Sequence, residues 1–191
     1  MKNKAIKINK KKIIFIIMFI LIGIAIVSRY IYINNKYPSP IVEEHKLNEE
    51  VEYNGVKITA KEFKLVKDEE LRKMDLKNVN MYEEDEEKMN AGVVTLNIKN
   101  DSNEIKKIET YAFVLSTINW RNGLNLEMFQ NFNDNDTKLY LELKPGEEVT
   151  NKYVYTMITD QFTEKCWNNI DDEKFKLVLN LYPVNKSINL N

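Results

Sequence analysis

The first pattern along the chain is a continuous apolar segment near the amino terminus. It runs from Ile13 to Val27 without a polar side chain. As an α-helix it is roughly 22 Å long, which is shorter than the roughly 30 Å hydrocarbon core of a bilayer. Extending the helix to Ile33 supplies the missing length. We therefore predict a transmembrane helix over residues 13–33.

The residues that flank this segment favour an uncleaved membrane anchor. Residues 1–12 form a tail with six lysines and no acidic residue, and basic residues beside a first span stay on the cytoplasmic side. A basic side chain can extend toward the lipid headgroups, and tyrosines suit the aromatic belt of a membrane. The predicted anchor flanks are Lys10, Lys11, Lys12, Arg29, Tyr30 and Tyr32. This arrangement predicts a cytoplasmic amino terminus and an extracytoplasmic carboxyl-terminal domain.

Two other interpretations of the apolar segment compete with the anchor. A cleaved signal peptide has the same basic start and apolar run, but it also has small residues at the cleavage site, which Ala25 and Val27 match poorly. A lipoprotein needs a cysteine just after the run, and the single cysteine of the chain is Cys166. Anchoring is therefore assigned to the apolar segment itself.

The region after the anchor shows the two-residue alternation of β-strands. A short stalk with two prolines, residues 34–40, leads into a domain over residues 41–191. Asn54-Gly55 is a strong hairpin signal, and Pro145-Gly146 favours a type II turn. The segments that read as strands are 51–53, 56–61, 91–99, 107–118, 139–143, 149–157 and 175–181. About seven such strands predict an all-β fold, an immunoglobulin-like antiparallel β-sandwich.

Two segments interrupt the strand pattern. Residues 66–90 are highly charged, and we expect a partly disordered insertion there that includes one helical turn. Residues 159–169 carry Phe162 and Cys166 at i and i+4 spacing. This spacing favours a short crossover helix capped by Thr159 or Asp160.

Charge divides the chain into two unlike parts. The 191 residues contain 28 Lys+Arg and 29 Asp+Glu, a formal net charge of -1. Seven of the basic groups and none of the acidic groups precede Asn34, so the remainder has 21 basic against 29 acidic groups, a net of -8. Because basic charge is not spread along the chain, we expect no nucleic-acid partner.

The residue inventory favours binding over catalysis. One Cys cannot form an internal disulfide, and one Cys with one His cannot form a structural zinc site. His45 is the single imidazole, no Ser-x-x-Lys pattern occurs, and the five glycines are too scattered for a phosphate loop. We expect no enzyme activity, no catalytic residue, no metal and no cofactor. A hydrolase with paired carboxylates is a weaker alternative.

A few side chains stand out as candidates for binding. Trp120 and Arg121 lie at a predicted loop edge, where an aromatic ring can stack on a sugar or anchor a protein, although a core tryptophan fits the same position. Cys166 fits core packing better than reactivity. The acidic run Glu83–Glu87 and the segment Asn133–Thr137 lack the ligand spacing of a calcium loop, so both read as solvated loops.

A resemblance to a known class of domains rests on four segments, which read NGVKITAKEFKL, VVTLNIKND, LKPGEEVTNKYVY and FKLVLNLYP. Together with the anchor they are similar to the telokin-like, immunoglobulin-fold domains of Gram-positive surface proteins. The Pro-Gly-Glu turn before a long strand is the most specific part. The resemblance implies a cell-surface location and a fold, and it supplies no catalytic residue because most of these families have no known function.

These observations predict a single-pass, membrane-anchored protein with a non-catalytic protein-interaction or accessory domain at the cell surface. The expected partners are the lipid bilayer and an extracytoplasmic protein or cell-wall component. The alternative is a cell-wall glycan-binding module in which Trp120 contacts the sugar.

Overall fold

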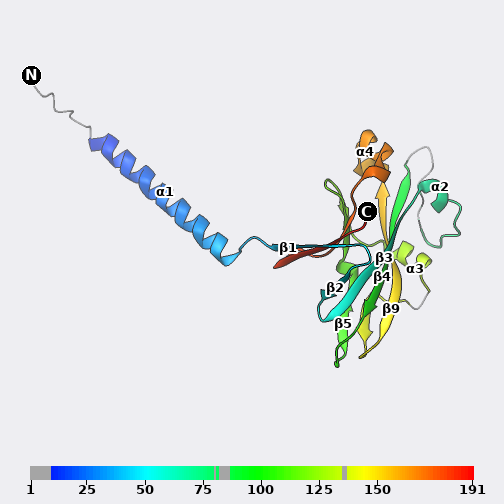
Figure 1. The fold of residues 1–191 in the computed structure, drawn as a ribbon. Helices are drawn as coiled ribbons and strands as arrows, with labels where there is room; N and C mark the ends of the chain where they lie inside the picture. The colour runs from blue at the N-terminus through cyan, green and yellow to red at the C-terminus, as the bar shows by residue number, and fades with distance from the viewer. Residues whose placement is uncertain (1–9, 80, 82–86, 135–136) are drawn as a thin grey trace, which may run out of the picture. The chain divides into compact units, whose positions relative to one another are not determined.

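The computed structural model describes residues 10–79, 81, 87–134 and 137–191 (Figure 1). The chain divides into two units, Met1–Pro40 and Ile41–Asn191. We describe each unit by itself.

The first unit contains one long helix, α1, over Lys10–Lys36. Its 27 residues make it about 40 Å long, and it extends beyond the predicted 13–33 segment at both ends. None of its side chains is buried. The helix is long and apolar enough to cross a membrane, a property that membrane anchors share with signal sequences. Near its carboxyl end, the Cζ atom of Arg29 lies 5.4 Å from the centroid of the Tyr32 ring.

The second unit is a β-sandwich, which confirms the predicted fold class, with eleven strands among the described residues. Sheet A has the order β1-β11-β10-β6-β7, sheet B has the order β2-β3-β4-β9, and sheet C pairs β5 with β8. The strands are β1 (Ile41–Lys46), β2 (Glu50–Tyr53), β3 (Val56–Val66), β4 (Met89–Lys99), β5 (Lys106–Glu109), β6 (Val114–Ser116), β7 (Arg121–Asn122), β8 (Tyr140–Leu143), β9 (Glu148–Ile158), β10 (Lys176–Asn180) and β11 (Val184–Asn189).

The two predicted turns form where local chemistry favours them. Asn54 and Gly55 both have positive φ, 49° and 78°, which matches a type I′ turn and joins β2 to β3. Gly146 has φ 77°, and its N–H donates to the carbonyl oxygen of Asn100 at 2.8 Å. This bond ties the β8–β9 turn to the end of β4.

Several strands differ from the prediction. The predicted strand 107–118 is divided into β5, a 3-10 turn η1 (Thr110–Ala112) and β6. Sheet A also contains β1 and β11, which pair in parallel, and the short β7. The sequences of β1 and β11 are rich in charged and amide side chains, so they show no clear alternation, and their pairing depends on long-range contacts.

Short helices fill the connections between strands. The helical segments are α2 (Asp68–Leu71), α3 (Leu126–Phe132), α4 (Glu164–Asn168), η2 (Thr159–Gln161) and η3 (Ile170–Asp172). The predicted crossover helix is α4, but its cap is Thr163, whose Oγ1 accepts a bond from the N–H of Cys166 at 3.3 Å. The predicted insertion over 66–90 contains α2 and the start of β4, and its residues 80 and 82–86 lie outside the described residues.

Short helices cover part of the outer face of sheet B, whereas the outer face of sheet A carries no helix among the described residues. The inner faces of the two sheets share a core, in which Leu96 and Ile98 of sheet B and Leu177 of sheet A are fully buried. The outer face of sheet B carries a second apolar cluster with α2 and α3, which lie on the same side of β4 and β9 (Figure 1). This second cluster contains Val66, Leu71, Met89, Ala91, Val93, Met128 and Val154.

The free edge of β9 is closed by asparagines. The Nδ2 group of Asn133 donates to the carbonyl oxygen of Lys152 at 2.7 Å, and the Lys152 N–H donates to Asn133 Oδ1 at 2.8 Å. Farther along, Asn125 N–H donates to the Val154 carbonyl at 2.9 Å. These bonds occupy groups that a neighbouring strand would use, so this part of the edge, at Lys152 and Val154, is protected from pairing with another chain.

Candidate functional site

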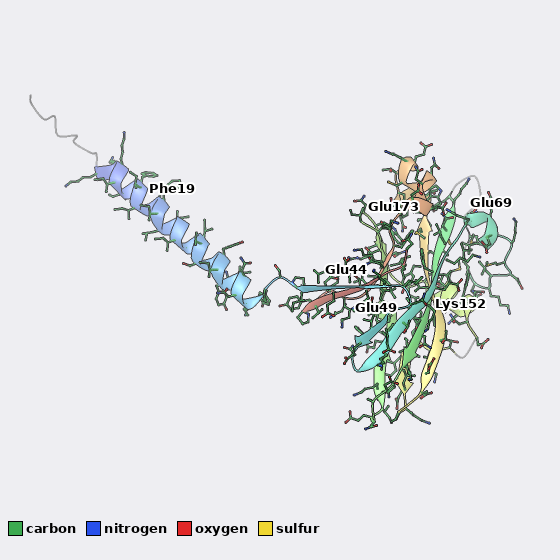
Figure 2. All side chains as sticks on the ribbon, viewed as in Figure 1. Phe19, Glu44, Glu49, Glu69, Lys152 and Glu173 are labelled. Atoms are coloured by element: carbon green, nitrogen blue, oxygen red, sulfur yellow. The ribbon has the colours of Figure 1, made fainter. Side chains whose placement is uncertain are left out.

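The outer face of sheet A is hollowed into a groove with a volume of about 460 Å³. All five strands of the sheet contribute to its lining, together with residues 172–174 and the turn between β6 and β7. Glu44 and Glu173 are the two lining residues labelled in Figure 2. The groove therefore combines side chains that are distant in the sequence.

The floor of the groove is low because its side chains are short. Ser116, Val178 and Ser187 line it from β6, β10 and β11, and all three are buried. Ser187 pairs with Val178 across β10 and β11, and Ser116 pairs with Lys176 across β6 and β10. Because the two short residues Val178 and Ser187 lie side by side in register and Ser116 is on the next strand, the surface dips between the longer side chains around them.

Charged groups surround this floor. Lys176 Nζ lies 2.5 Å from Glu44 Oε1, which links β10 to β1 across β11. The hydrogen bond and positive charge from Lys176 hold the pKa of Glu44 below its usual value. Arg121 and Lys174 are exposed, and neither has a hydrogen-bond or ion-pair partner within the described part of the chain. Two cations are thus available to an incoming ligand.

An apolar side chain stands at the rim of the groove. Ile118 is 89% exposed and lies in the turn between β6 and β7, where Thr117 N–H donates to the Trp120 carbonyl at 2.8 Å. A closed turn holds this isoleucine in the solvent. An exposed apolar side chain beside an unpaired arginine is a common composition for a protein-binding surface.

The predicted binding pair Trp120 and Arg121 is divided between two environments. Trp120 is 8% exposed, its Nε1–H donates to Gln161 Oε1 at 2.9 Å, and its ring centroid lies 5.6 Å from that of Phe162. Trp120 is therefore a core residue, and the ring face that a sugar would need is covered. Arg121 follows it and lines the groove, because successive residues of an extended strand point to opposite sides.

A family match covers most of the second unit. The model for a domain of unknown function, DUF5028, matches residues 42–186, from β1 to β11. The chain belongs to the DUF5028 family. The match leaves α1 outside the family domain, and the resemblance to telokin-like surface domains stays a prediction. No curated protein matches the chain.

Solved structures of several uncharacterised proteins are similar to this DUF5028 chain. The yjhA protein from Bacillus subtilis has 12% identity and a TM-score of 0.47, covering 77% of this chain and 99% of its own. A conserved hypothetical protein from Bacillus anthracis has 17% identity and a TM-score of 0.49, covering 77% and 95%. An uncharacterized beta-sandwich protein from Clostridium difficile has 10% identity and a TM-score of 0.44, covering 80% and 97%.

The remaining sequence candidates lie away from the groove floor. His45 Nδ1 lies 2.9 Å from Glu49 Oε1, and His45 Nε2 is buried without a partner in the described residues. Cys166 is half-buried on α4, which is more exposed than the core position that we expected. Among the described residues, neither His45 nor Cys166 takes part in a hydrogen-bonded pair of a nucleophile and a base.

The acidic and Asn-rich segments form no described cation site. Most of the run Glu83–Glu87 and two residues of Asn133–Thr137 lie outside the described residues. Within the described ranges, no group of three His, Cys, Asp or Glu side chains is placed to hold a metal ion. A second hollow of about 520 Å³ lies along β8 and β9, but Asp134 and Thr137 at its border flank undescribed residues. We therefore take the groove of sheet A as the candidate site.

Proposed function

We propose that this chain is a single-pass membrane protein with an extracytoplasmic, immunoglobulin-like domain that binds a protein partner through the groove of sheet A, without catalysis. The length and composition of α1 support the anchor, and the six lysines before residue 13 support a cytoplasmic amino terminus. Anionic lipid on the cytoplasmic leaflet would further hold these lysines.

The carrying observation is the contrast between the outer faces of the two sheets. α2 and α3 cover the part of the outer face of sheet B around Val93 and Val154, whereas sheet A presents a groove, an exposed isoleucine and an unpaired arginine on one surface. An uncovered face with apolar and charged groups in one place favours recognition of another molecule.

The composition of the groove favours a protein partner over a glycan. None of its lining residues is aromatic, although stacking on aromatic rings is the usual way for a protein surface to contact a sugar face. Ile118 supplies an apolar anchor, and Arg121 and Lys174 supply donors for carboxylates. Because Asp172 and Glu173 also line the groove, a segment of a partner protein that carries apolar side chains and charges of both signs matches these groups.

Site-specific photo-crosslinking in cells tests this function. A photoreactive residue replaces Ile118 in the full chain, and a matched control replaces Ile105, which is also exposed but lies before β5 of sheet C. We expect position 118 to capture a discrete extracytoplasmic protein that position 105 does not capture, and Arg121→Glu to reduce the yield several-fold. Equal capture at both positions, capture of lipid or glycan alone, or a cytoplasmic partner would contradict the proposal.

A further inference from the structure

One end of the sandwich brings together the first strand and a hairpin from the end of the chain. Ile41 begins β1 and pairs with Val184, the first residue of β11. The N–H of Ile41 donates to the carbonyl oxygen of Pro183 at 3.2 Å. The turn between β10 and β11, which contains Leu181 and Tyr182, therefore lies beside the start of β1.

This end exposes four large apolar or aromatic side chains. Ile41 is 66% exposed, Val42 62%, Leu181 48% and Tyr182 49%. We call these four residues the apolar end patch. Val42 also lines the groove, whereas the other three do not, so the patch and the groove are adjoining surfaces that can be tested separately.

The apolar end patch also lacks charge in a highly charged domain. Residues 37–42 and 180–185 contain no Asp, Glu, Lys or Arg. The unit that contains the patch, 41–191, has 20 basic and 29 acidic residues. A surface with this net charge is repelled by anionic lipid, so an uncharged end is the part of the domain that can approach a membrane at low electrostatic cost.

The length of the linker restricts which surface this end can meet. Residues 37–40 are the whole connection between the end of α1 and the start of β1. Five Cα–Cα steps span at most about 18 Å. If α1 spans a bilayer, Ile41 is therefore held within about 18 Å of the end of α1, which is close enough for the start of β1 to reach the headgroup region, roughly 5–8 Å deep on each side.

We propose that the apolar end patch inserts into the headgroup region of the outer leaflet, so that the domain contacts the bilayer at a second site besides α1. Leucine and isoleucine gain from leaving water, and tyrosine suits the interface because its ring is apolar and its hydroxyl is polar. This inference rests on the proposed membrane anchor. It adds that the domain is held against the membrane with the β10–β11 turn facing the lipid.

Fluorescence quenching in vesicles tests the contact. The full chain carries Cys166→Ser, so that a single introduced cysteine takes an environment-sensitive dye. One variant is labelled at Tyr182→Cys, and the matched control is labelled at Ile118→Cys. Ile118 lies two residues after Ser116, which pairs with Lys176 at the start of β10. Tyr182 lies in the β10–β11 turn, which follows the end of that strand. The control label is thus at the opposite end of the same sheet.

Both proteins are reconstituted into phosphatidylcholine–phosphatidylglycerol vesicles that contain a lipid with a nitroxide on its headgroup. We expect at least twofold stronger quenching at position 182 than at position 118. A third label at Phe19→Cys, with a nitroxide deep in the acyl chain, reports on α1. Quenching at 19 with equal, weak quenching at 182 and 118 overturns the inference and leaves the anchor intact. Absence of quenching at 19 overturns the anchor itself.

A second pair of variants separates a lipid contact from simple proximity. With the label at Ile41→Cys, Leu181→Asp places a charge in the apolar end patch, and Leu126→Asp places the same charge at an exposed leucine of α3. We expect Leu181→Asp to reduce the quenching at 41 at least twofold and Leu126→Asp to leave it unchanged. Equal quenching in both variants overturns the proposed insertion.

Discussion

Sheets A and B share one core but differ in what covers their outer faces. Sheet B has three strands of eleven residues, β3, β4 and β9, and α2 and α3 cover much of its outer face. Sheet A has strands of two to six residues, and its outer face is an open groove. The long sheet, covered in part on its outer face, can supply most of the stability, and under the proposed function the short, open sheet presents side chains for binding.

Two asparagines illustrate this difference. Asn100, at the end of β4, is fully buried and all its side-chain groups are bonded: Nδ2 donates to the carbonyls of Glu104 and Leu143, and Oδ1 accepts from the N–H and hydroxyl of Ser102. Asn185 is half-buried in the groove of sheet A, and its side chain has no hydrogen bond among the described residues. The first amide organises two turns, and the second is available to a ligand.

The largest expected effect comes from replacing the asparagine of sheet B. Asn100→Ala leaves buried carbonyl and N–H groups without partners, and we expect it to lower the free energy of unfolding by about 3 kcal/mol. The matched change Asn185→Ala removes no bond and should alter it by less than about 0.5 kcal/mol. Urea unfolding of the full chain in detergent micelles, followed by tryptophan fluorescence, measures both values. Similar losses in the two variants would contradict the division of roles between the sheets.

The second effect probes the place where the two sheets meet. Gly92 of β4 faces Leu115 of β6, and a Cβ atom at position 92 would lie 2.4 Å from Leu115 Cδ2 and 3.3 Å from Phe63 Cε2. We expect Gly92→Ala to lower the free energy of unfolding by about 2 kcal/mol, because Leu115 is fully buried and must move. Gly123→Ala is the control, since no atom lies within 4 Å of its added Cβ.

A double variant shows whether the loss arises from this contact. Leu115→Ala alone leaves a cavity, but it also removes the atom that a new Cβ at position 92 would strike. The double variant Gly92→Ala/Leu115→Ala should therefore lose less free energy of unfolding than the sum of the losses in the two single variants. Additive losses would indicate that position 92 is sensitive for a reason other than the approach of the two sheets.

Much of sheet B could be predicted from the sequence, because its signals are local. The strand segment 91–99 is rich in β-branched residues, the segment 149–157 alternates clearly, and the turns at Asn54-Gly55 and Pro145-Gly146 have residues that tolerate positive φ. Helix α3 was missed, although Asn125 before it is an N-cap signal: its side chain accepts from Met128 N–H at 2.9 Å.

The candidate site depends on information that no single segment carries. The groove floor exists because strand pairing places Ser116 of β6 beside the β10–β11 hairpin that carries Val178 and Ser187, although β6 is about 60 residues earlier in the chain. Alternation predicts that Trp120 and Arg121 point to opposite sides, but it does not say which side is the core. The fully exposed position of Ile118 likewise follows from the turn that closes on Trp120.

The smallest expected effect compares one ion pair from each sheet as the pH falls. Hydrogen bonds from Lys99 and Lys57 of sheet B hold the pKa of Asp101 below its usual 3.8, and the bond from Lys176 of sheet A holds the pKa of Glu44 below its usual 4.5. A carboxyl group whose pKa is lower in the folded state stabilises the fold above its unfolded pKa. That contribution is lost as the pH falls through the folded pKa. The contribution of Glu44 should therefore be lost below about pH 4.5 and that of Asp101 below about pH 3.8.

Because Asp101 contacts two lysines and Glu44 contacts one, Asp101→Asn should remove more of this acid sensitivity than Glu44→Gln. Urea midpoints of the full chain between pH 3 and 6 measure the difference, and added salt should reduce it because exposed pairs are screened. A larger effect from Glu44→Gln would mean that the ion pair across the groove contributes more to stability than the pair network of sheet B, and the open sheet would then be part of the scaffold.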